Sequence, residues 1–214
     1  MKLYGYFRSA AAYRVRIALN LKGIAVEHAF RHLRKGEQRA PDYLALNPQG
    51  LVPTLVLDDG RVLTQSLAII EWLDETHPEP PLLAADPYGR AKVRAFGLAL
   101  AAETHAVQNL RVLNRVRALA GADADADAQA TAWAAAVNQE GLAACEVLAD
   151  RESGPFCFGA SPTLADICLV PQLANARRFG VDVAPFGRLL EAEAACRALP
   201  AFADAAPDRQ PDAE

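Results

Sequence analysis

Residues 47–73 read NPQGLVPTLVLDDGRVLTQSLAIIEWL, and this stretch decides the fold. Two short runs rich in apolar and β-branched residues, 54–57 and 61–64, flank an Asp-Gly pair at 59–60. Asp-Gly favours a tight turn between antiparallel strands, because both central residues of such a turn need positive φ angles. The pattern therefore predicts a β-hairpin.

After the hairpin the apolar period changes. Leu67, Ile70 and Leu73 recur at helical spacing, and Ser66 fits the N-cap position, where its hydroxyl can accept a hydrogen bond from a helical N–H. The start of a helix carries free N–H groups and a partial positive charge, which suit a carboxylate or a phosphate. Gln65 and Ser66 are therefore predicted to bind an anionic group.

Val52 and Pro53 lead into the first strand of the hairpin. Proline cannot donate to the strand ladder, and an X-Pro bond adopts the cis form at low cost. A cis bond would turn the backbone N–H and C=O of Val52 outward, where an extended peptide could pair with them. We expect a peptide-like ligand on Val52, with its carboxylate on Gln65 and Ser66.

The residues before this stretch predict a βαβ unit. Strands are expected at 2–6 and 25–30, joined by a helix that Gly23 ends. Two strands separated by one helix are usually parallel. With a short helix near Tyr43, the hairpin and the following helix, the unit is similar to the thioredoxin fold and is predicted to span residues 1–78.

The residues after it predict a second, all-helical domain at 88–214. Three prolines at 78–81 cannot continue a helix, so residues 79–87 are interpreted as a linker. Asp86 and Pro87 then fit the N-cap and first position of a new helix. Helices are expected at about 88–120, 129–150, 163–178, 186–197 and 200–206. Thr163 and Asp166 have capping-box spacing, and the low-complexity residues 121–128 are interpreted as a solvated turn.

Composition excludes several classes of protein. The net charge is −4 and the basic residues are scattered, which argues against a nucleic-acid partner. No run approaches the roughly 20 apolar residues of a membrane span, and the first residues read as a strand, not as a signal peptide. The cysteines lie far apart, so buried free thiols in a reducing cytoplasm are expected, with no disulfide framework and no metal site. They are Cys145, Cys157, Cys168 and Cys196.

Several motifs resemble the zeta class of glutathione transferases, the family of maleylacetoacetate and maleylpyruvate isomerases. Residues 47–55 and 65–69 are similar to the glutathione-binding half of a transferase, and FRSAAAYRVRIAL at 7–19 narrows the resemblance to the zeta class. Further matches lie at 108–113, 171–179 and 209–212. The resemblance implies the glutathione transferase fold, an α/β thioredoxin-like domain followed by an all-α domain, and a cytoplasmic homodimer with glutathione as cofactor.

The activity that the resemblance implies is glutathione-dependent cis–trans isomerisation of a maleyl keto acid in the catabolism of aromatic compounds. The thiolate of glutathione would add reversibly to the cis double bond, and glutathione would be regenerated. Two alternatives stay open. The chain could be a transferase that conjugates glutathione to electrophiles, or a glutathione-binding protein with little turnover.

Ser9 is the predicted partner of the glutathione sulfur. A free cysteine thiol has a pKa of about 8.5, and a hydroxyl donor and a helix N-terminus both stabilise the thiolate. Ser9 stands where the first strand ends and the first helix begins, so it offers both, and the resemblance assigns it this role. It can also cap its helix, and the two roles are compatible. Tyr6 is the alternative sulfur partner, although a tyrosine on a strand more often packs in the core.

The chain departs from the family at the residues after Ser9. The zeta pattern is Arg-Ser-Ser-Cys, whereas this chain has Arg8, Ser9, Ala10 and Ala11. A hydroxyl and a thiol beside the sulfur position are therefore missing. One hydrogen bond to a charged group contributes roughly 1.5–3 kcal/mol, so the departure is expected to weaken activity without abolishing it.

The resemblance also implies which residues hold the rest of glutathione. Val52 and Pro53 would contact its cysteinyl backbone, and Gln49 its glycyl end. The γ-glutamyl group would lie on the start of the helix after the hairpin, and residues of the helical domain would reach in. The residues at the helix start are Gln65 and Ser66, and those of the helical domain are His105, Gln108 and Asn109. His105 is expected to share a helix face with Asn109.

Arginines are the predicted ligands of the substrate carboxylates. The guanidinium fork pairs with a carboxylate through two parallel hydrogen bonds. Arg8 next to Ser9, Arg111 and Arg177 are the candidates, and Arg8 is also expected to steady negative charge on the reacting substrate. Other arginines are expected to serve structure: Arg14 and Arg16 on the first helix, facing away from its apolar stripe, and Arg178 in a salt bridge.

Overall fold

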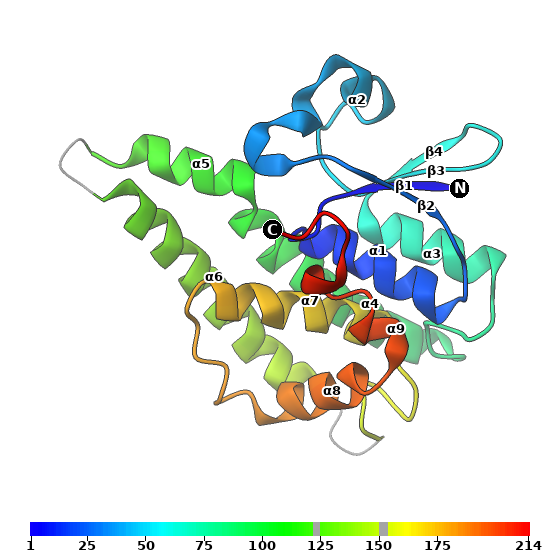
Figure 1. Cartoon of the computed structure of the whole chain (residues 1–214). Helices are drawn as coiled ribbons and strands as arrows, with labels where there is room; N and C mark the ends of the chain where they lie inside the picture. Colours follow the sequence, from blue (N-terminus) through cyan, green and yellow to red (C-terminus); the bar gives the residue numbers. More distant parts are fainter. Residues whose placement is uncertain (122–124, 150–153) are drawn as a thin grey trace. The chain divides into compact units, whose positions relative to one another are not determined.

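The computed structural model describes residues 1–121, 125–149 and 154–214 (Figure 1). The chain forms two compact units. The first comprises Met1–Pro81 and Arg197–Glu214, and the second comprises Leu82–Cys196. No helix within the described ranges is long and apolar enough to cross a membrane.

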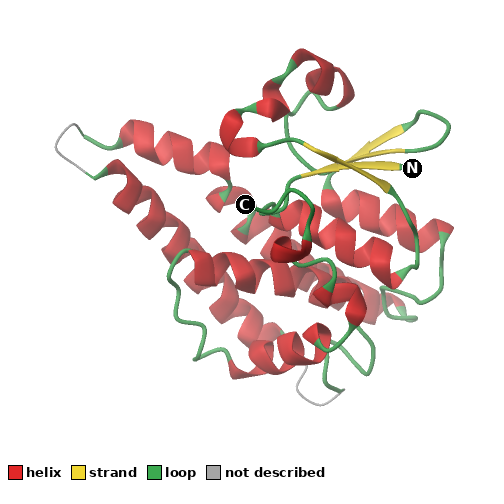
Figure 2. Ribbon diagram, viewed as in Figure 1, coloured by secondary structure: helices red, strands yellow, loops and turns green. Residues whose placement is uncertain are grey.

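The first unit contains a four-stranded mixed sheet with the order β2-β1-β3-β4, drawn in yellow in Figure 2. β1 (Lys2–Gly5) pairs in parallel with β2 (Glu27–Phe30). β3 (Thr54–Val56) runs antiparallel to β1, and the predicted hairpin joins it to β4 (Val62–Thr64). The thioredoxin-like fold is therefore confirmed.

Helices cover both sides of this sheet. α1 (Ala10–Leu21) packs beside α3 (Ser66–Thr76) on one face, while the short α2 (Pro41–Leu46) lies on the other side (Figure 1). Two 3₁₀ turns, Leu33–Lys35 and Glu37–Arg39, precede α2. The core between the sheet and the two long helices consists of fully buried aliphatic side chains, among them Leu3, Val15, Ile17, Leu55, Ile69 and Leu73.

α1 is buried on more of its surface than its apolar stripe predicts. Arg14 and Arg16, which were expected to face away from the apolar stripe, are only 1% and 5% exposed, so the helix is buried beyond that stripe. Their guanidinium groups find polar partners inside: Arg14 Nη1 donates to Ser66 Oγ (3.3 Å), and Arg16 donates to the carbonyls of Phe7 (3.2 Å) and Ala205 (3.0 Å). Buried charges of this kind are tolerated because they are hydrogen-bonded, and both arginines have the structural role expected of them.

The end of the chain belongs to the first unit. The sequence placed residues 197–214 with the helical domain, but α9 (Pro200–Ala203) packs against α1, where Asn20 Nδ2 donates to the carbonyl of Ala201 (3.0 Å). A single 3₁₀ turn, Pro207–Arg209, follows. Helical periodicity predicts a helix but not the surface on which the helix packs, so this part of the domain division was not available from the sequence pattern.

The regular secondary structure in the described residues of the second unit is helical, apart from one isolated bridge between Phe156 and Gly159. Two predicted helix starts are confirmed. Asp86 accepts hydrogen bonds from the N–H groups of Tyr88 and Gly89, and Thr163 and Asp166 form a capping box. The elements are α4 (Pro87–Leu98), η3 (Ala99–Thr104), η4 (Ala106–Gln108), α5 (Leu110–Leu119), α6 (Ala126–Leu148), α7 (Leu164–Arg178) and α8 (Gly187–Arg197).

The helix expected at 88–120 is interrupted. A π-helical turn and a 3₁₀ turn follow α4, and Asn109 then adopts an extended conformation (φ −72°, ψ 164°). Its side-chain oxygen accepts from the N–H of Val112 (3.3 Å), which makes Asn109 the N-cap of α5. Asparagine offers its own backbone this alternative to a continuous helix, and apolar periodicity does not reveal it.

α6 begins earlier than predicted. Asp125 accepts from the N–H of Ala128 (2.9 Å) and caps a helix from Ala126, whereas the sequence placed the start at Gln129. Residues 122–124 of the expected turn and Asp150, the expected end of the helix, lie outside the described residues. The four cysteines are buried and free, as predicted, and burial raises the pKa of Cys145 to about 12.

Candidate functional site

A tight turn joins β1 to α1 and carries the predicted sulfur partner. The N–H of Ser9 donates to the carbonyl of Tyr6 (2.9 Å), which closes the turn. Ser9 is the N-cap of α1, since its Oγ accepts from the N–H of Ala12 (3.2 Å). This confirms the capping role. Because the cap uses Oγ only as an acceptor, the hydroxyl hydrogen remains available to a ligand on this half-buried side chain.

The residues on either side of Ser9 differ in exposure. Arg8 is exposed, and its guanidinium carbon lies 5.0 Å from the centre of the Phe7 ring. Ala10 is buried at 4% exposure, whereas Ala11 is half-buried. Of the two polar groups that this chain lacks relative to the zeta pattern, the one at position 11 is therefore the one that a ligand could contact.

Tyr6 packs in the core of the first unit. Its side chain is 4% exposed and clusters with Phe7, Tyr43 and Val52. The Tyr6 ring lies 4.8 Å from that of Phe7 and 5.1 Å from that of His32, measured between ring centres. These contacts support the core interpretation of Tyr6 over a role at the sulfur.

The Val52–Pro53 peptide bond is cis, the form that the sequence allows at low cost. Within the part of the chain that the structure describes, no hydrogen bond reaches the backbone N–H or C=O of Val52. The neighbouring residues are firmly held: Asn47 Nδ2 donates to the carbonyl of Leu51 (2.8 Å) and to Thr54 Oγ1 (3.1 Å). The segment therefore offers a free peptide edge on a fixed backbone.

Asn47 and Tyr43 are supporting residues that the sequence reasoning missed. The Tyr43 hydroxyl lies 2.6 Å from the carbonyl oxygen of Leu51 and 2.8 Å from Thr54 Oγ1, so it shares both partners of Asn47. Tyr43 is fully buried, and burial raises the pKa of its hydroxyl, which keeps it protonated and able to donate. Asn47 begins the motif at 47–55, and this position was the only signal for it in the sequence.

Gln65 and Gln49 contact each other directly. Gln65 Nε2 donates to Gln49 Oε1 (2.8 Å), so the structure brings two predicted glutathione partners together on the surface of the first unit. Gln65 also has φ 69°, a left-handed conformation that no other non-glycine residue adopts in the described ranges. Such backbone strain in a non-glycine residue is typical of functional sites.

The start of α3 differs by one residue from the prediction. The N-cap is Gln65, not Ser66, and no side chain caps the helix; Ser66 is its first residue and is 6% exposed. The positive φ at Gln65 lets the chain enter the helix one residue earlier than the cap pattern assumed. The first N–H groups of α3 therefore lack a side-chain acceptor, a situation that favours binding of an anion.

Arg14 lies behind Ser66 and was not predicted as part of the site. Because Arg14 Nη1 donates to Ser66 Oγ (3.3 Å), the Ser66 hydroxyl hydrogen has to point elsewhere. The hydroxyl can then donate to a carboxylate placed at the helix start. This contact could not be inferred from the sequence pattern, because the two residues are 52 positions apart.

In the second unit, three predicted residues cluster at the break between η4 and α5. Gln108 is 2% exposed, and no hydrogen-bond partner of its Oε1 is found among the described residues. Asn109 caps α5, and Arg111 is exposed on the first turn of that helix. His105 does not share a helix face with Asn109, because the chain leaves the helix between them; that expectation is wrong.

Arg177 lies in an ion pair. Its Nη1 donates to Glu193 Oε1 (2.6 Å) and its Nη2 to Glu193 Oε2 (2.5 Å), and these hydrogen bonds raise the pKa of Arg177. Its fork is therefore engaged with a protein carboxylate instead of being open. The neighbouring Arg178 donates to Asn175 Oδ1 (3.0 Å) and lies over the ring of Phe179.

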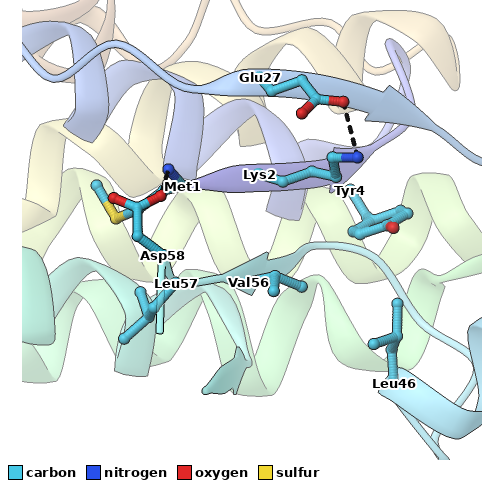
Figure 3. A pocket seen from close by; sticks show the side chains of 8 residues that line it. All are labelled: Met1, Lys2, Tyr4, Glu27, Leu46, Val56, Leu57 and Asp58. Carbon is cyan, nitrogen blue, oxygen red and sulfur yellow. Dashed lines mark hydrogen bonds and ion pairs between the residues drawn. The ribbon is translucent and has the colours of Figure 1, made fainter. Parts of the chain in front are cut away.

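A pocket on the sheet of the first unit is lined by residues other than the predicted site residues. Figure 3 shows its lining side chains, with Lys2 paired to Glu27 (2.7 Å) and the amino group of Met1 paired to Asp58. None of the residues that line this pocket is a predicted site residue. The candidate site of the first unit is instead the surface made by the β1–α1 turn, the Val52–Pro53 segment and the start of α3.

Comparison with known proteins identifies the family of this chain. Residues 3–81 match the family described as "Glutathione S-transferase, N-terminal domain". The maleylpyruvate isomerase of Ralstonia sp is 46% identical over 99% of each chain. The maleylacetoacetate isomerase of Rhizobium meliloti is 50% identical over 97% of this chain and 96% of its own length.

Solved structures agree with these sequence matches. The holo structure of a maleylpyruvate isomerase, described as a bacterial glutathione S-transferase in the zeta class, has a TM-score of 0.95 at 45% identity with both chains fully covered. A maleylacetoacetate isomerase from Anaeromyxobacter dehalogenans, with dicarboxyethyl glutathione and citrate in its active site, has a TM-score of 0.88 at 44% identity over 100% of this chain and 93% of its own. The chain therefore belongs to the zeta class of glutathione transferases, the family of enzymes that includes the maleylacetoacetate and maleylpyruvate isomerases.

Proposed function

We propose that this protein is a glutathione-dependent cis–trans isomerase of a maleyl keto acid, of the maleylacetoacetate or maleylpyruvate type, in the catabolism of aromatic compounds. The observation that carries the proposal is the similarity to isomerases of these two substrates over nearly the whole chain. By the same family membership, we propose that it acts as a cytoplasmic homodimer.

The first unit has the features that a glutathione site requires. The free N–H and C=O of Val52 can pair with the cysteinyl backbone, as one strand pairs with another. The uncapped start of α3, with the Ser66 hydroxyl beside it, suits the γ-glutamyl carboxylate. Gln49 and Gln65 present an amide pair to the remaining polar groups of the tripeptide. The residues present therefore fit glutathione.

Ser9 and the start of α1 would stabilise the thiolate. Bound glutathione supplies a nucleophile whose reversible addition turns the double bond of the substrate into a single bond that can rotate. The Ser9 hydroxyl would donate its free hydrogen to the sulfur, and the first N–H groups of α1 would favour its negative charge. Both effects lower the thiol pKa from about 8.5 toward neutrality.

Arginines would bind the carboxylates of the substrate. Arg8 is exposed beside Ser9, where a cation can also oppose charge that develops on the conjugated oxygen. In the second unit Arg111 is exposed, and Arg177 would have to exchange Glu193 for a substrate carboxylate. The dicarboxyethyl glutathione in the relative from Anaeromyxobacter dehalogenans supports a ligand with carboxylates next to the sulfur.

A conjugating transferase is the second candidate. Dicarboxyethyl glutathione is itself a conjugate, and a relative from Euphorbia esula bears the name of a zeta-class transferase. Ala10 and Ala11 also stand where the zeta pattern has a serine and a cysteine. In this reaction glutathione would remain in the product.

One assay separates the candidates. The purified protein is incubated with maleylacetoacetate or maleylpyruvate, with and without glutathione, while the isomer ratio and free glutathione are both measured. Isomerisation that requires glutathione and does not consume it supports the proposed function. Stoichiometric loss of glutathione to an electrophile would instead support the transferase. Tight binding of glutathione without turnover would support a binding protein, and isomerisation without glutathione would exclude the proposed mechanism.

A further inference from the structure

The turn that carries Ser9 is held by the far end of the chain. Phe7 is buried, and its N–H donates to Asp212 Oδ2 (2.9 Å) across a separation of 205 residues. The carbonyl of Phe7 accepts from Arg16 Nη2 (3.2 Å). Both backbone polar groups of a central residue in the Tyr6–Ser9 turn are therefore fixed by side chains from outside the turn.

The segment that carries Asp212 is anchored at several points. Gln210 Nε2 donates to the carbonyls of Asp204 (3.0 Å) and Ala206 (2.9 Å). Glu214 pairs with both His32 and Arg34. Figure 1 shows this final segment in red, ending beside the start of α1. A side chain held on both sides along its own segment can act as a fixed point for the turn.

Asp212 also lies near two basic groups, the buried Arg16 and the exposed His28. Burial lowers the pKa of Arg16 to about 10, and the charges of Tyr13 and Asp212 oppose that change. Burial also lowers the pKa of His28, helped by the Arg16 charge, while Asp212 acts in the opposite direction. Asp212 is thus close enough to Arg16 and His28 to influence both electrostatically, and it is half-buried itself.

We propose that Asp212 is a positioning residue for the thiolate site: by holding the Phe7 peptide it fixes the turn that places the Ser9 hydroxyl and the first N–H groups of α1. Asp212 acts through Phe7 and touches neither glutathione nor substrate. The inference rests on the proposed function, because that function gives Ser9 its task.

Positioning and charge predict opposite effects when Asp212 is replaced. An anion near the sulfur disfavours a thiolate, so if Asp212 acted through its charge, its removal would lower the thiol pKa of bound glutathione. If Asp212 acts by holding the turn, its removal displaces the Ser9 hydroxyl and raises that pKa. The loss of one hydrogen bond to the thiolate corresponds to a rise of about one pKa unit.

The test titrates the thiolate of bound glutathione by its ultraviolet absorbance in the full-length protein. We expect Asp212→Ala to raise the thiol pKa by about one unit, with a roughly tenfold lower kcat and little change in glutathione affinity. Asp212→Asn retains an oxygen acceptor for the Phe7 N–H, so it should restore most of the wild-type pKa. Asp208→Ala removes an exposed carboxylate from the same segment and serves as the matched control.

An unchanged or lowered thiol pKa in Asp212→Ala would overturn the proposal. If that variant does not fold, Gln210→Ala takes its place, since it loosens the segment without altering Asp212; a raised thiol pKa supports positioning, and an unchanged one overturns it. These readouts need only bound glutathione. A wild-type protein that binds glutathione but isomerises neither maleyl acid would refute the proposed function, while the comparison of thiol pKa values would still decide the role of Asp212.

Discussion

The starts of α1 and α3 lie in the same unit but are built differently. α1 is capped by its own serine, since Ser9 Oγ accepts from the N–H of Ala12. α3 has no side-chain cap, and the chain enters it through a left-handed Gln65. A buried cation, Arg14, stands behind its first residue, whereas the turn before α1 is held by Asp212.

This difference matches two kinds of ligand group. A carboxylate carries a full charge and several acceptor positions, so it benefits from uncapped N–H groups and a nearby cation. A thiol is mostly neutral at pH 7, so its site has to lower its pKa. A single hydroxyl donor next to a capped helix start can do this, because the sulfur needs only one hydrogen-bond donor. We therefore expect damage at α3 to affect glutathione affinity, and damage at α1 to affect reactivity.

The largest effect is expected from Ser9→Ala. Removal of the Ser9 hydroxyl should lower kcat up to about 100-fold, because the lost bond is made to a charged sulfur. Glutathione affinity should change little, although loss of the cap should lower stability by about 1 kcal/mol. Steady-state kinetics and calorimetric binding of glutathione measure the two parts separately.

Ser9→Thr is the matched control, because it keeps a hydroxyl and a capping oxygen. It should retain most of the activity. If Ser9→Ala turned over at the wild-type rate, the contrast between the two helix starts would fail, and Ser9 would be only a cap.

Ser66→Ala should have the reverse signature. It removes the hydroxyl that Arg14 orients at the start of α3, so glutathione affinity should fall about tenfold while the pKa of the bound thiol stays at the wild-type value. Thr76→Ala, which removes an exposed hydroxyl at the other end of the same helix, should bind normally. A shift of the thiol pKa in Ser66→Ala would show that the two helix starts are not independent.

Local chemistry made most of the fold predictable. The hairpin and the capping box at Thr163 depend on interactions within a few residues, and both were predicted correctly. The turn itself has a positive φ only at Gly60 (86°), so the expectation of positive φ angles at both Asp59 and Gly60 is wrong. The helix ends that were missed depend on single polar side chains: Asn109 and Asp125 cap helices where apolar periodicity continues or has not yet begun. Periodicity reports buried faces, and it does not report caps.

The sequence predicts the candidate site as a set of residues but not as a network of contacts. The sequence named Gln49, Gln65 and Ser66, yet it could not show that Gln49 bonds to Gln65, or that Arg14 lies behind Ser66. Such contacts join residues far apart in the chain, and they exist only once the tertiary fold has formed. The same limit applies to Asp212, whose partner is 205 positions away.

Gln49→Ala tests how far the α3 start depends on its surface partner. The variant frees the Gln65 side chain and removes one neutral hydrogen bond at an exposed position. Such a bond contributes about 0.5–1.5 kcal/mol, so we expect glutathione affinity to fall by no more than about fivefold, with kcat unchanged. Calorimetric titration with glutathione measures the affinity, and steady-state kinetics measure kcat. If Gln49→Ala lowered glutathione affinity more than Ser66→Ala does, the glutamine pair, and not the helix start, would be the main binding site of the carboxylate.

The smallest effect is expected where the α1 start departs from the zeta pattern. Ala11 is half-buried, so Ala11→Cys would place a thiol within reach of a ligand, whereas Ala10 is 4% exposed and Ala10→Ser would place a hydroxyl in the interior. A thiol is a weak donor, so Ala11→Cys should raise kcat by only about twofold. Ala10→Ser should leave kcat unchanged and lower stability by about 1–3 kcal/mol, because its hydroxyl loses water without a provided partner.

Paired kinetics and thermal unfolding of the two variants distinguish the positions. If Ala10→Ser raised kcat and Ala11→Cys did not, position 10 would be the one that contacts the sulfur. The start of α1 would then have to rearrange when the ligand binds, because Ala10 is buried. If neither variant changed kcat, Ser9 and the helix start would already supply the stabilisation that the thiolate needs. The missing serine and cysteine would then be dispensable, because a single donor at a well-held turn suffices for the chemistry.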